Sequence, residues 1–481
     1  MKEAVSKFLD RLNKFYMGRL YPAVVCVLVL CGFLCSKEHI LIPTIVLFAC
    51  GAFWVCRSVK PLIAPLCTFI YSLSNGNAIF GSEASDYYFT GWRIKALVLL
   101  AALATVSIVA FFIKAGIIQK MLVKKTPLLF PLLLLSASFL LSGAFSDKWA
   151  AKDLLYGFFL VFSFLVVYVL FYHGFSEDDD TTELGDYFSY VTLLMSLVLI
   201  VEMVWLYTGE NGVISPEGEI VKSMIIFGWG SCNNAGVYLA MLIPMNFYGA
   251  YRSRIGGVYF LVATATYICA VLTLSRNALL FSTLADIGCL IGFSIYGNPK
   301  KRRSFAYSAL AILLCAAVVY VVYREPLILA LSSYAEMGVS DSGRFEIWRE
   351  ALSTFLENPI LGNGFYEVLQ TGELKASFIP AMAHNTALQF MSSMGLVGLA
   401  SYVFYRIRSV RAFTDRPELL KTMLGVSILI LLGESLLDNF IFQIHPMFYY
   451  SIAMAIAYRR YDEQLLWRPL IDAREVDFGI R

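Results

Sequence analysis

Long apolar runs separated by short polar breaks extend from residue 20 to residue 459. A helix that crosses a membrane needs roughly 20 mostly apolar residues, within a range of about 17–25. The runs predict about fourteen such crossings on this criterion. They cover 20–36, 40–56, 61–74, 94–114, 127–145, 153–172, 187–207, 232–250, 256–275, 277–296, 304–323, 384–407, 420–437 and 445–459. The pattern therefore predicts an all-α protein, a polytopic transmembrane helix bundle of about 12–14 spans.

The composition supports this prediction. Hydrophobic residues make up 59% of the 481 residues and charged residues 15%, with a mean hydropathy of +0.69. A soluble domain usually carries about 25% charged and about 45–50% apolar residues, so this chain lacks the polar groups to cover a water-exposed surface. The net charge of +3 gives no global field of the kind that marks a nucleic-acid-binding protein. We therefore expect a bilayer environment and no nucleic-acid partner.

The ten cysteines lie in or beside apolar runs and form no CxxC pair and no Cys/His cluster. They are predicted to be small buried residues, without a structural disulfide or a zinc site. No acidic pair or metal-ligand cluster dominates the predicted outer loops. The sequence therefore predicts neither a metal ion nor a cofactor.

Basic residues set the orientation of the predicted spans. The start of the chain is basic and amphipathic, and no small-residue cleavage site follows the first apolar run, which predicts a cytoplasmic lead-in. When alternate loops are assigned to opposite sides, most of the 38 lysines and arginines fall on the side of the N-terminus. The positive-inside rule then predicts that both termini are cytoplasmic. The run 61–74 is short and begins at Pro61, but this orientation requires it to cross.

The predicted spans divide the chain into five regions. They are an N-terminal transmembrane region with the basic lead-in (1–125), central transmembrane helices (126–323), an extracytoplasmic loop (324–383), C-terminal transmembrane helices (384–460) and a cytoplasmic tail (461–481). The loop is long for a compact protein, and such loops are usually functional. Candidate chemistry is therefore sought first on the extracytoplasmic side.

The stretch 340–365 of this loop contains a helical pattern. Its apolar residues recur at helical spacing, which predicts a short amphipathic helix against the outer membrane face. Asp341 or Ser342 can cap the start, and Asn358 marks the end. Arg344 falls in the first turn, where a cation opposes the helix dipole unless an anion such as a phosphate is shared. The alternative is an ion pair of Arg344 with Asp341 or a lipid headgroup.

Two further polar residues fall at predicted outer ends of spans. Arg276 interrupts a long apolar segment between two basic loops and marks the turn between two spans. An arginine at that depth normally faces a protein interior or a water-filled cavity, with snorkelling to headgroups as the alternative. His384 begins the span after the long loop, where the helix dipole disfavours a positive charge and suits a neutral histidine acting as a base. The alternative is a structural hydrogen bond.

Together these residues indicate a reaction. Two arginines suit the diphosphate of a lipid-linked donor, and a neutral imidazole suits the hydroxyl of an acceptor. Arg276 and Arg344 would hold the diphosphate and stabilise its departure, while His384 would take the acceptor proton. The sequence therefore favours an enzyme that transfers a group from a lipid diphosphate at the outer membrane face.

Several blocks of this sequence resemble the O-antigen ligase and O-antigen polymerase family. In chain order they are 227–244 (FGWGSCNNAGVYLAMLIP), 275–277 (SRN), 342–348 (SGRFEIW), 358–360 (NPI), 362–364 (GNG) and His384-Asn385 followed by Gly395 and Gly398. The resemblance covers about residues 140–460 and rests on the combination and order of the blocks. The chain departs from the family in its extra N-terminal pair of spans and in Asn277, where a glycine is common.

The resemblance implies a multi-spanning, inverting, metal-independent glycosyltransferase that uses undecaprenyl-diphosphate-linked glycans. It implies that Arg276 and Arg344 engage the diphosphate and that His384 activates the acceptor hydroxyl. The expected location is the bacterial cytoplasmic membrane, with the active face extracytoplasmic. The acceptor would be a saccharide or a lipid-linked acceptor, in lipopolysaccharide or other surface polysaccharide biosynthesis. Both ligase and polymerase remain open.

Two other classes of function remain as alternatives. A glycolipid transporter or flippase favours inverted repeats and broken helices near the midplane, whereas this chain concentrates its polar features on one face. A non-catalytic scaffold or sensor is the other alternative. The roles of Asp286, Glu202, Glu434 and His445 also stay open, because ionisable groups in spans are either functional or ties between helices.

Overall fold

The computed structural model describes most of the chain. The described residues are 2–74, 91–147, 149–209, 212–215, 220–296, 299–303, 343–368, 374–376 and 383–466, with a few single positions between 305 and 321. The predicted span 304–323 falls mostly outside them, and so do residues 324–342, 369–373 and 377–382 of the predicted long loop.

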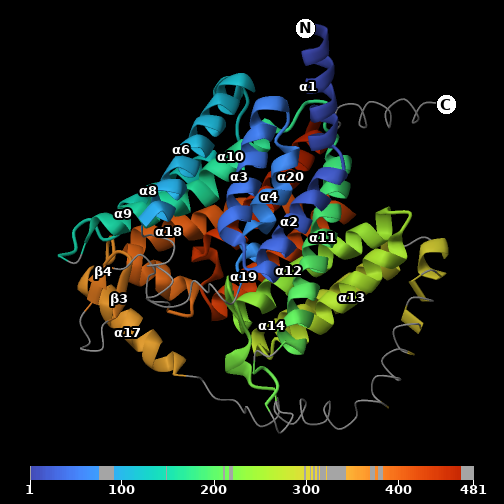
Figure 1. The fold of residues 1–481 in the computed structure, drawn as a ribbon. Coiled ribbons are helices and arrows are strands. Elements are labelled where there is room, and N and C mark those ends of the chain that lie inside the picture. Colours follow the sequence, from blue (N-terminus) through green and yellow to red (C-terminus); the bar gives the residue numbers. More distant parts are fainter. Residues whose placement is uncertain are drawn as a thin grey trace, which may run out of the picture.

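The described residues form a bundle of helices (Figure 1). The helices are α1 (Lys2–Met17), α2 (Leu20–Cys35), α3 (Glu38–Val55), α4 (Ile63–Thr68), α6 (Gly91–Lys114), α7 (Ile117–Val123), α8 (Leu129–Leu140), α9 (Ala151–Val161), α10 (Val167–Gly174), α11 (Thr181–Thr208), α12 (Cys232–Arg252), α13 (Gly256–Leu272), α14 (Arg276–Tyr296), α17 (Arg344–Glu357), α18 (Thr386–Thr414), α19 (Leu419–Leu437) and α20 (Ile444–Leu466). The strands form two short antiparallel pairs: β1 (Ile226–Phe227) with β2 (Gly230–Ser231), and β3 (Tyr366–Val368) with β4 (Leu374–Ala376).

The predicted all-α polytopic bundle is confirmed. Among the described residues, seven helices are long and apolar enough to cross a membrane, or eight if the bent pair α1–α2 is one span. This number counts only the long apolar helices of the described residues, so it is smaller than the predicted 12–14 spans. Helices α8 and α13 are apolar but have only 12 and 17 residues. Helix α12 has 21 residues with several polar side chains, and protein rather than lipid surrounds most of it.

Alternate connections between consecutive helices lie at the same end of the bundle, which we call the basic end. There the Val59 amide donates to the Gly174 carbonyl at 3.0 Å, and the Arg460 guanidinium pairs with Glu418 at 2.6 Å. The basic end comprises segments 56–60, 114–125, 174–181, 252–254, 415–421 and 459–463. These segments hold many of the lysines and arginines that the positive-inside rule groups together.

The remaining loops gather at the opposite end. There the Gly143 amide donates to the Leu361 carbonyl at 3.1 Å. Figure 1 shows α14 and α17 toward this end and α1 at the other. The opposite end comprises segments 35–38, 72–74, 141–146, 226–231, 273–276, 359–365, 383–389 and 437–443. It holds the parts of the chain that the sequence predicts to be extracytoplasmic.

The predicted crossing 61–74 connects the two ends as short helical pieces rather than as one helix. It begins beside Gly174 at the basic end, and at the opposite end the Ser74 hydroxyl lies 3.5 Å from the Glu38 carboxylate. Its pieces are Lys60–Leu62, α4 and Phe69–Ser72. Pro61 and Pro65 each lack the amide that a continuous helix needs, which accounts for the interruption.

Candidate functional site

The end of the described loop is fastened to a break in α18. Gly395 has φ 64° and ψ −160° inside this helix, a backbone conformation that suits glycine. The amides released by the break are satisfied by the loop, since Leu396 donates to the Pro359 carbonyl at 2.9 Å. In the other direction, the Gly364 amide donates to the Ser393 carbonyl at 2.9 Å. The loop therefore replaces the missing hydrogen bonds of the broken helix.

Buried polar side chains complete this attachment. The Asn363 side chain accepts a hydrogen bond from Asn358 Nδ2 at 2.7 Å and donates to the Thr354 carbonyl of α17. The Asp153 carboxylate of α9 accepts from the Phe365 amide. The block 358–364 thus acts as a scaffold that fixes the C-terminal end of α17 against α18.

Arg344 is the first residue of α17. The predicted amphipathic helix is confirmed, and it ends immediately before Asn358, as the sequence predicts. The residue before the helix is Gly343, with φ 73°, while Asp341 and Ser342 lie outside the described residues. Arg344 is partly exposed at the N-terminal end of α17, and the C-terminal end of this helix is fastened to α18.

Arg276 is the first residue of α14, directly after the turn that ends α13. The predicted turn between two helices is confirmed. Ser275 caps α14, since its hydroxyl lies 3.4 Å from the Ala278 amide. Helix α12 crosses close to this point, because a Cβ on Gly236 would lie 2.4 Å from the Ala278 side chain. The Arg276 side chain is exposed and starts from a closely packed helix end.

His384 pairs with a carboxylate that lies far away in the sequence. Its Nδ1 atom lies 3.1 Å from Oδ1 of Asp438, the residue after α19. The His384 side chain is 34% exposed and that of Asp438 11%. The imidazole therefore reaches the surface, while the carboxylate lies behind it. We call these two residues the His384–Asp438 pair.

The predicted start of this helix at His384 is wrong by two residues. Helix α18 begins at Thr386, and Asn385 caps it by accepting a hydrogen bond from the Leu388 amide at 3.1 Å. His384 precedes the cap with φ 46°, which is unusual for a residue with a side chain. The histidine thus stands just outside the helix N-terminus.

A hydrogen-bond network holds both members of the pair. The Asp438 carboxylate also accepts from the Asn439 amide at 2.8 Å. The Asn439 side chain donates a hydrogen bond to the side-chain oxygen Oε1 of Gln389 at 2.6 Å. The same Oε1 atom accepts a hydrogen bond from the Ala383 backbone amide at 2.9 Å. The network joins the residue before His384 to the residue after Asp438, which fixes the two segments relative to each other.

Arg276 lies at the same end as this pair, on a helix packed against α19. A Cβ on Gly433 of α19 would lie 2.2 Å from the Phe281 ring of α14. Arg276 and Asp438 each lie little more than one turn from this contact, about 7.5 Å along the helix axis. Helix α14 begins at the opposite end and α19 ends there. Going from the contact to Arg276 and going from it to Asp438 therefore both lead toward the opposite end. The structure thus brings Arg276 and the pair to one level of the bundle, while the approach of Arg344 to them stays a prediction.

Sequence reasoning missed the contact of Asp438 with His384. The available signal was a carboxylate directly after the apolar run 420–437, although nothing in the sequence joins it to His384. Glu434 lies one turn before Asp438, and it is 1% exposed, with Oε1 lacking a hydrogen-bond partner among the described residues. It is a second carboxylate directly behind the pair.

The other ionisable residues left open by the sequence have different surroundings. Glu202 accepts a hydrogen bond from the Trp229 indole at 2.9 Å and is fully buried. His445 Nε2 lies 3.0 Å from the Cys67 carbonyl among aromatic rings. Both residues tie separate segments of the bundle together. Asp286 lies partly buried in the middle of α14.

Within the described ranges, no group of three or more His, Cys, Asp or Glu side chains is placed to hold a metal ion. The independence from metals and cofactors stays a prediction.

The fold and the site define a class of protein, a polytopic helical membrane protein with a polar site at one end of the bundle. Residues 259–403 match the family model described as O-antigen ligase. The match covers less than a third of the chain and supports the O-antigen ligase and polymerase family that the sequence resembles. A search of curated proteins found no match. The matched segment contains Arg276, Arg344 and His384 and ends before Asp438.

Proposed function

We propose that the protein transfers a saccharide from an undecaprenyl-diphosphate-linked donor to a glycan or lipid-linked acceptor. The family supports glycosyl transfer in general. The observation that carries the finer proposal is the contact between His384 and Asp438 at 3.1 Å, beside the helix that begins with Arg276. This arrangement supplies a base and a cation at one end of the bundle.

The carboxylate determines which imidazole nitrogen can act as the base. In this arrangement the Nδ1 atom of His384 would carry the ring hydrogen and donate a hydrogen bond to the Asp438 carboxylate, which accepts it. Nε2 is then left as the acceptor, in the way that a buried aspartate orients the histidine of a catalytic triad. Nε2 would take the proton from the acceptor hydroxyl. Asp438 serves as a positioning residue.

The arginines would act on the leaving group. Arg276 and Arg344 each begin a helix, where free amide groups and the helix dipole favour an anion. A guanidinium binds phosphate oxygens through charge-assisted hydrogen bonds, which strengthen as charge develops on the departing diphosphate. The two residues would therefore lower the barrier to departure more than they strengthen ground-state binding.

The proposed reaction is a single displacement. The acceptor oxygen forms a bond to the anomeric carbon, and the bond from that carbon to the diphosphate oxygen breaks. The electron pair of the broken bond leaves with the diphosphate, and the hydroxyl proton moves to His384. One displacement inverts the anomeric configuration and requires no metal, in line with the expectation from the family resemblance.

We place this reaction on the extracytoplasmic side of the bacterial cytoplasmic membrane. The basic loops gather at one end of the bundle and His384 lies at the other. The positive-inside rule puts the basic end, with both termini, in the cytoplasm. The donor glycan and the acceptor would then meet outside the cytoplasm. Ligation onto a final acceptor and polymerisation of repeat units fit this arrangement equally.

Reconstitution tests the proposal. The full chain in proteoliposomes receives undecaprenyl-diphosphate-linked glycan with either a lipid acceptor or a second donor molecule. We expect a longer or newly attached glycan and release of the lipid diphosphate, and the productive acceptor distinguishes ligase from polymerase. Movement of the donor across the membrane without a new glycosidic bond would instead establish the transporter alternative.

A further inference from the structure

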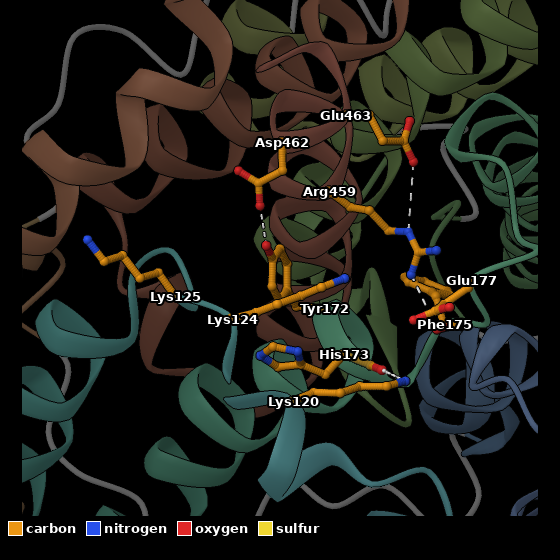
Figure 2. Close-up of a pocket in the computed structure, with 10 residues that line it drawn as sticks. All are labelled: Lys120, Lys124, Lys125, Tyr172, His173, Phe175, Glu177, Arg459, Asp462 and Glu463. Carbon is orange, nitrogen blue, oxygen red and sulfur yellow. Dashed lines mark hydrogen bonds and ion pairs between the residues drawn. The ribbon is translucent and has the colours of Figure 1, made fainter. Parts of the chain in front are cut away.

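A polar cavity lies at the basic end, opposite the His384–Asp438 pair. It has a volume of about 680 Å³. One wall is α7 with the residues that follow it, which supply Lys120, Lys124 and Lys125, and another wall is α20, which supplies Arg459 (Figure 2). The cavity therefore collects four cations from two separate parts of the chain.

Two of the acidic residues in this cavity already have partners. The Asp462 carboxylate accepts a hydrogen bond from the Tyr172 hydroxyl (Figure 2). Glu463 accepts from Arg460 at 3.3 Å and from the Thr181 hydroxyl. Glu177 is the remaining carboxylate, and it is exposed to solvent. None of these carboxylates forms an ion pair with a lysine of the cavity among the described residues, although Glu177 and Asp462 interact electrostatically with Lys120 and Lys124.

The four cations differ in the hydrogen bonds that they make within the protein. Arg459 donates to the carbonyl groups of Phe175 and Asp179, each at 3.3 Å. Lys120 donates to the His173 carbonyl at 3.3 Å (Figure 2). Lys124 and Lys125 are exposed and have no hydrogen bond or ion pair among the described residues. Two lysines are thus available to a ligand, and Lys120 lies behind them.

The pKa of Lys120 responds first to burial and then to the charges around it. Burial lowers the pKa of this lysine, Glu177 raises it, and Arg459 and Lys124 lower it. Repulsion between like charges that share a site is relieved when an anion binds among them. The cavity is therefore arranged to favour a compact anion.

The surface beside the lysines is strongly apolar. Leu122 is 82% exposed and Val123 85% exposed, and both directly precede Lys124. In a membrane protein, lysines next to exposed apolar side chains lie where the headgroups meet the acyl chains. A ligand that carries both a phosphate and a hydrocarbon chain satisfies the cations and this surface together.

We propose that this cavity binds the phosphate of an anionic phospholipid, with Lys124 and Lys125 contacting the phosphate and the acyl chains lying over Leu122 and Val123. A basic cavity between membrane helices is a general form of lipid headgroup recognition. The inference does not depend on the proposed glycosyl transfer, because no residue of the cavity belongs to that site.

Native mass spectrometry of the full chain in detergent tests this proposal. The probes are phosphatidylglycerol, phosphatidylcholine and inorganic phosphate. We expect retention of phosphatidylglycerol over phosphatidylcholine, and a loss of about tenfold or more in affinity in Lys124→Gln/Lys125→Gln, since each lysine near a headgroup contributes about 1 kcal/mol. The matched control is Arg254→Gln/Lys300→Gln, which removes the same charge from two exposed positions, one in the segment 252–254 of the basic end and one next to Lys301, which contacts that segment.

The controls separate the possible outcomes. Lys124→Arg/Lys125→Arg keeps both charges and should retain the lipid, which shows that the glutamine variant did not simply unfold. Equal loss in Arg254→Gln/Lys300→Gln would overturn the proposal, because net charge alone would then hold the lipid. Binding of inorganic phosphate at the same two lysines with the same affinity would contradict a phospholipid ligand. The cavity would then bind a soluble phosphate.

Discussion

The two ends of the bundle both carry positive charge, but the charge is organised in opposite ways. At the basic end, cations are numerous, and Lys124 and Lys125 extend from an exposed segment. At the opposite end, each candidate residue stands at or beside the start of a helix, and His384 rests on the partly buried Asp438. Numerous exposed cations suit topology and lipid contact, whereas a few fixed groups suit chemistry. The following predictions test this contrast.

Replacing His384 should have the largest effect on transfer. His384→Ala removes the proposed base, and we expect a loss of roughly 10²–10⁴-fold in turnover, the usual contribution of a positioned acid or base. Product formation in proteoliposomes at saturating donor measures this loss. Because His384 lies before the cap of α18, the melting temperature should change little. Turnover equal to that of the wild type would remove His384 from the mechanism.

The arginines should come next. Arg276→Ala and Arg344→Ala each remove a cation from the leaving diphosphate, and we expect roughly 10²–10³-fold slower turnover, as for loss of one donor to a developing anion. Arg349→Ala is the matched control, since Arg349 is exposed on the same helix as Arg344. Turnover in Arg344→Ala as fast as in Arg349→Ala would separate Arg344 from the reaction and leave Arg276 as the only proposed anion contact.

Asp438 should matter less than the histidine that it positions. In Asp438→Asn the side chain keeps its shape but can donate to Nδ1, which favours the wrong tautomer of His384. We expect roughly tenfold to 100-fold slower turnover, because water can reach a side chain that is 11% exposed and can support the imidazole in part. Initial rates with KM measured separately provide the test. A raised KM with unchanged turnover would contradict a positioning role.

Disrupting the attachment of the loop to α18 should lower the stability of the protein more than it slows the transfer reaction. A Cβ at Gly395 would lie 2.3 Å from the Ile360 carbonyl oxygen, at φ 64°. We expect Gly395→Ala to cost about 1–3 kcal/mol and to lower the melting temperature of the purified protein. Gly288→Ala is the control, because nothing lies within 4 Å of a Cβ at this position in α14. A melting temperature as high in Gly395→Ala as in Gly288→Ala would contradict the attachment of the loop.

Apolar runs were sufficient to predict the helices, because burial in lipid or protein demands apolar residues throughout a span. The turn at Arg276 and the amphipathic helix at Arg344 follow from charge placement and helical spacing. The division of 61–74 into short helical pieces is harder to predict from the sequence. The sequence contains both prolines, but it does not tell which neighbouring segments stabilise the pieces. Among the described residues fewer helices are long and strongly apolar than the predicted number of spans, because α8 and α13 are short and α12 carries polar side chains and is enclosed by protein.

The partners of the candidate site could not be predicted from the sequence. His384 and Asp438 belong to segments separated by α18 and α19, and no periodicity reports a contact between loop residues so far apart. The attachment of Pro359 to the break at Gly395 is likewise a tertiary hydrogen bond. Glycines at positions 362, 364 and 395 signalled unusual backbone, although not which segments would meet there.

The central claim is that Asp438 acts through His384. A double-mutant cycle tests it most directly, with turnover measured in the wild type, His384→Ala, Asp438→Asn and the double variant. We predict that the double variant is no slower than His384→Ala, because the carboxylate has nothing left to position. Losses that multiply in the double variant would contradict the account, since the two residues would then contribute to transfer independently.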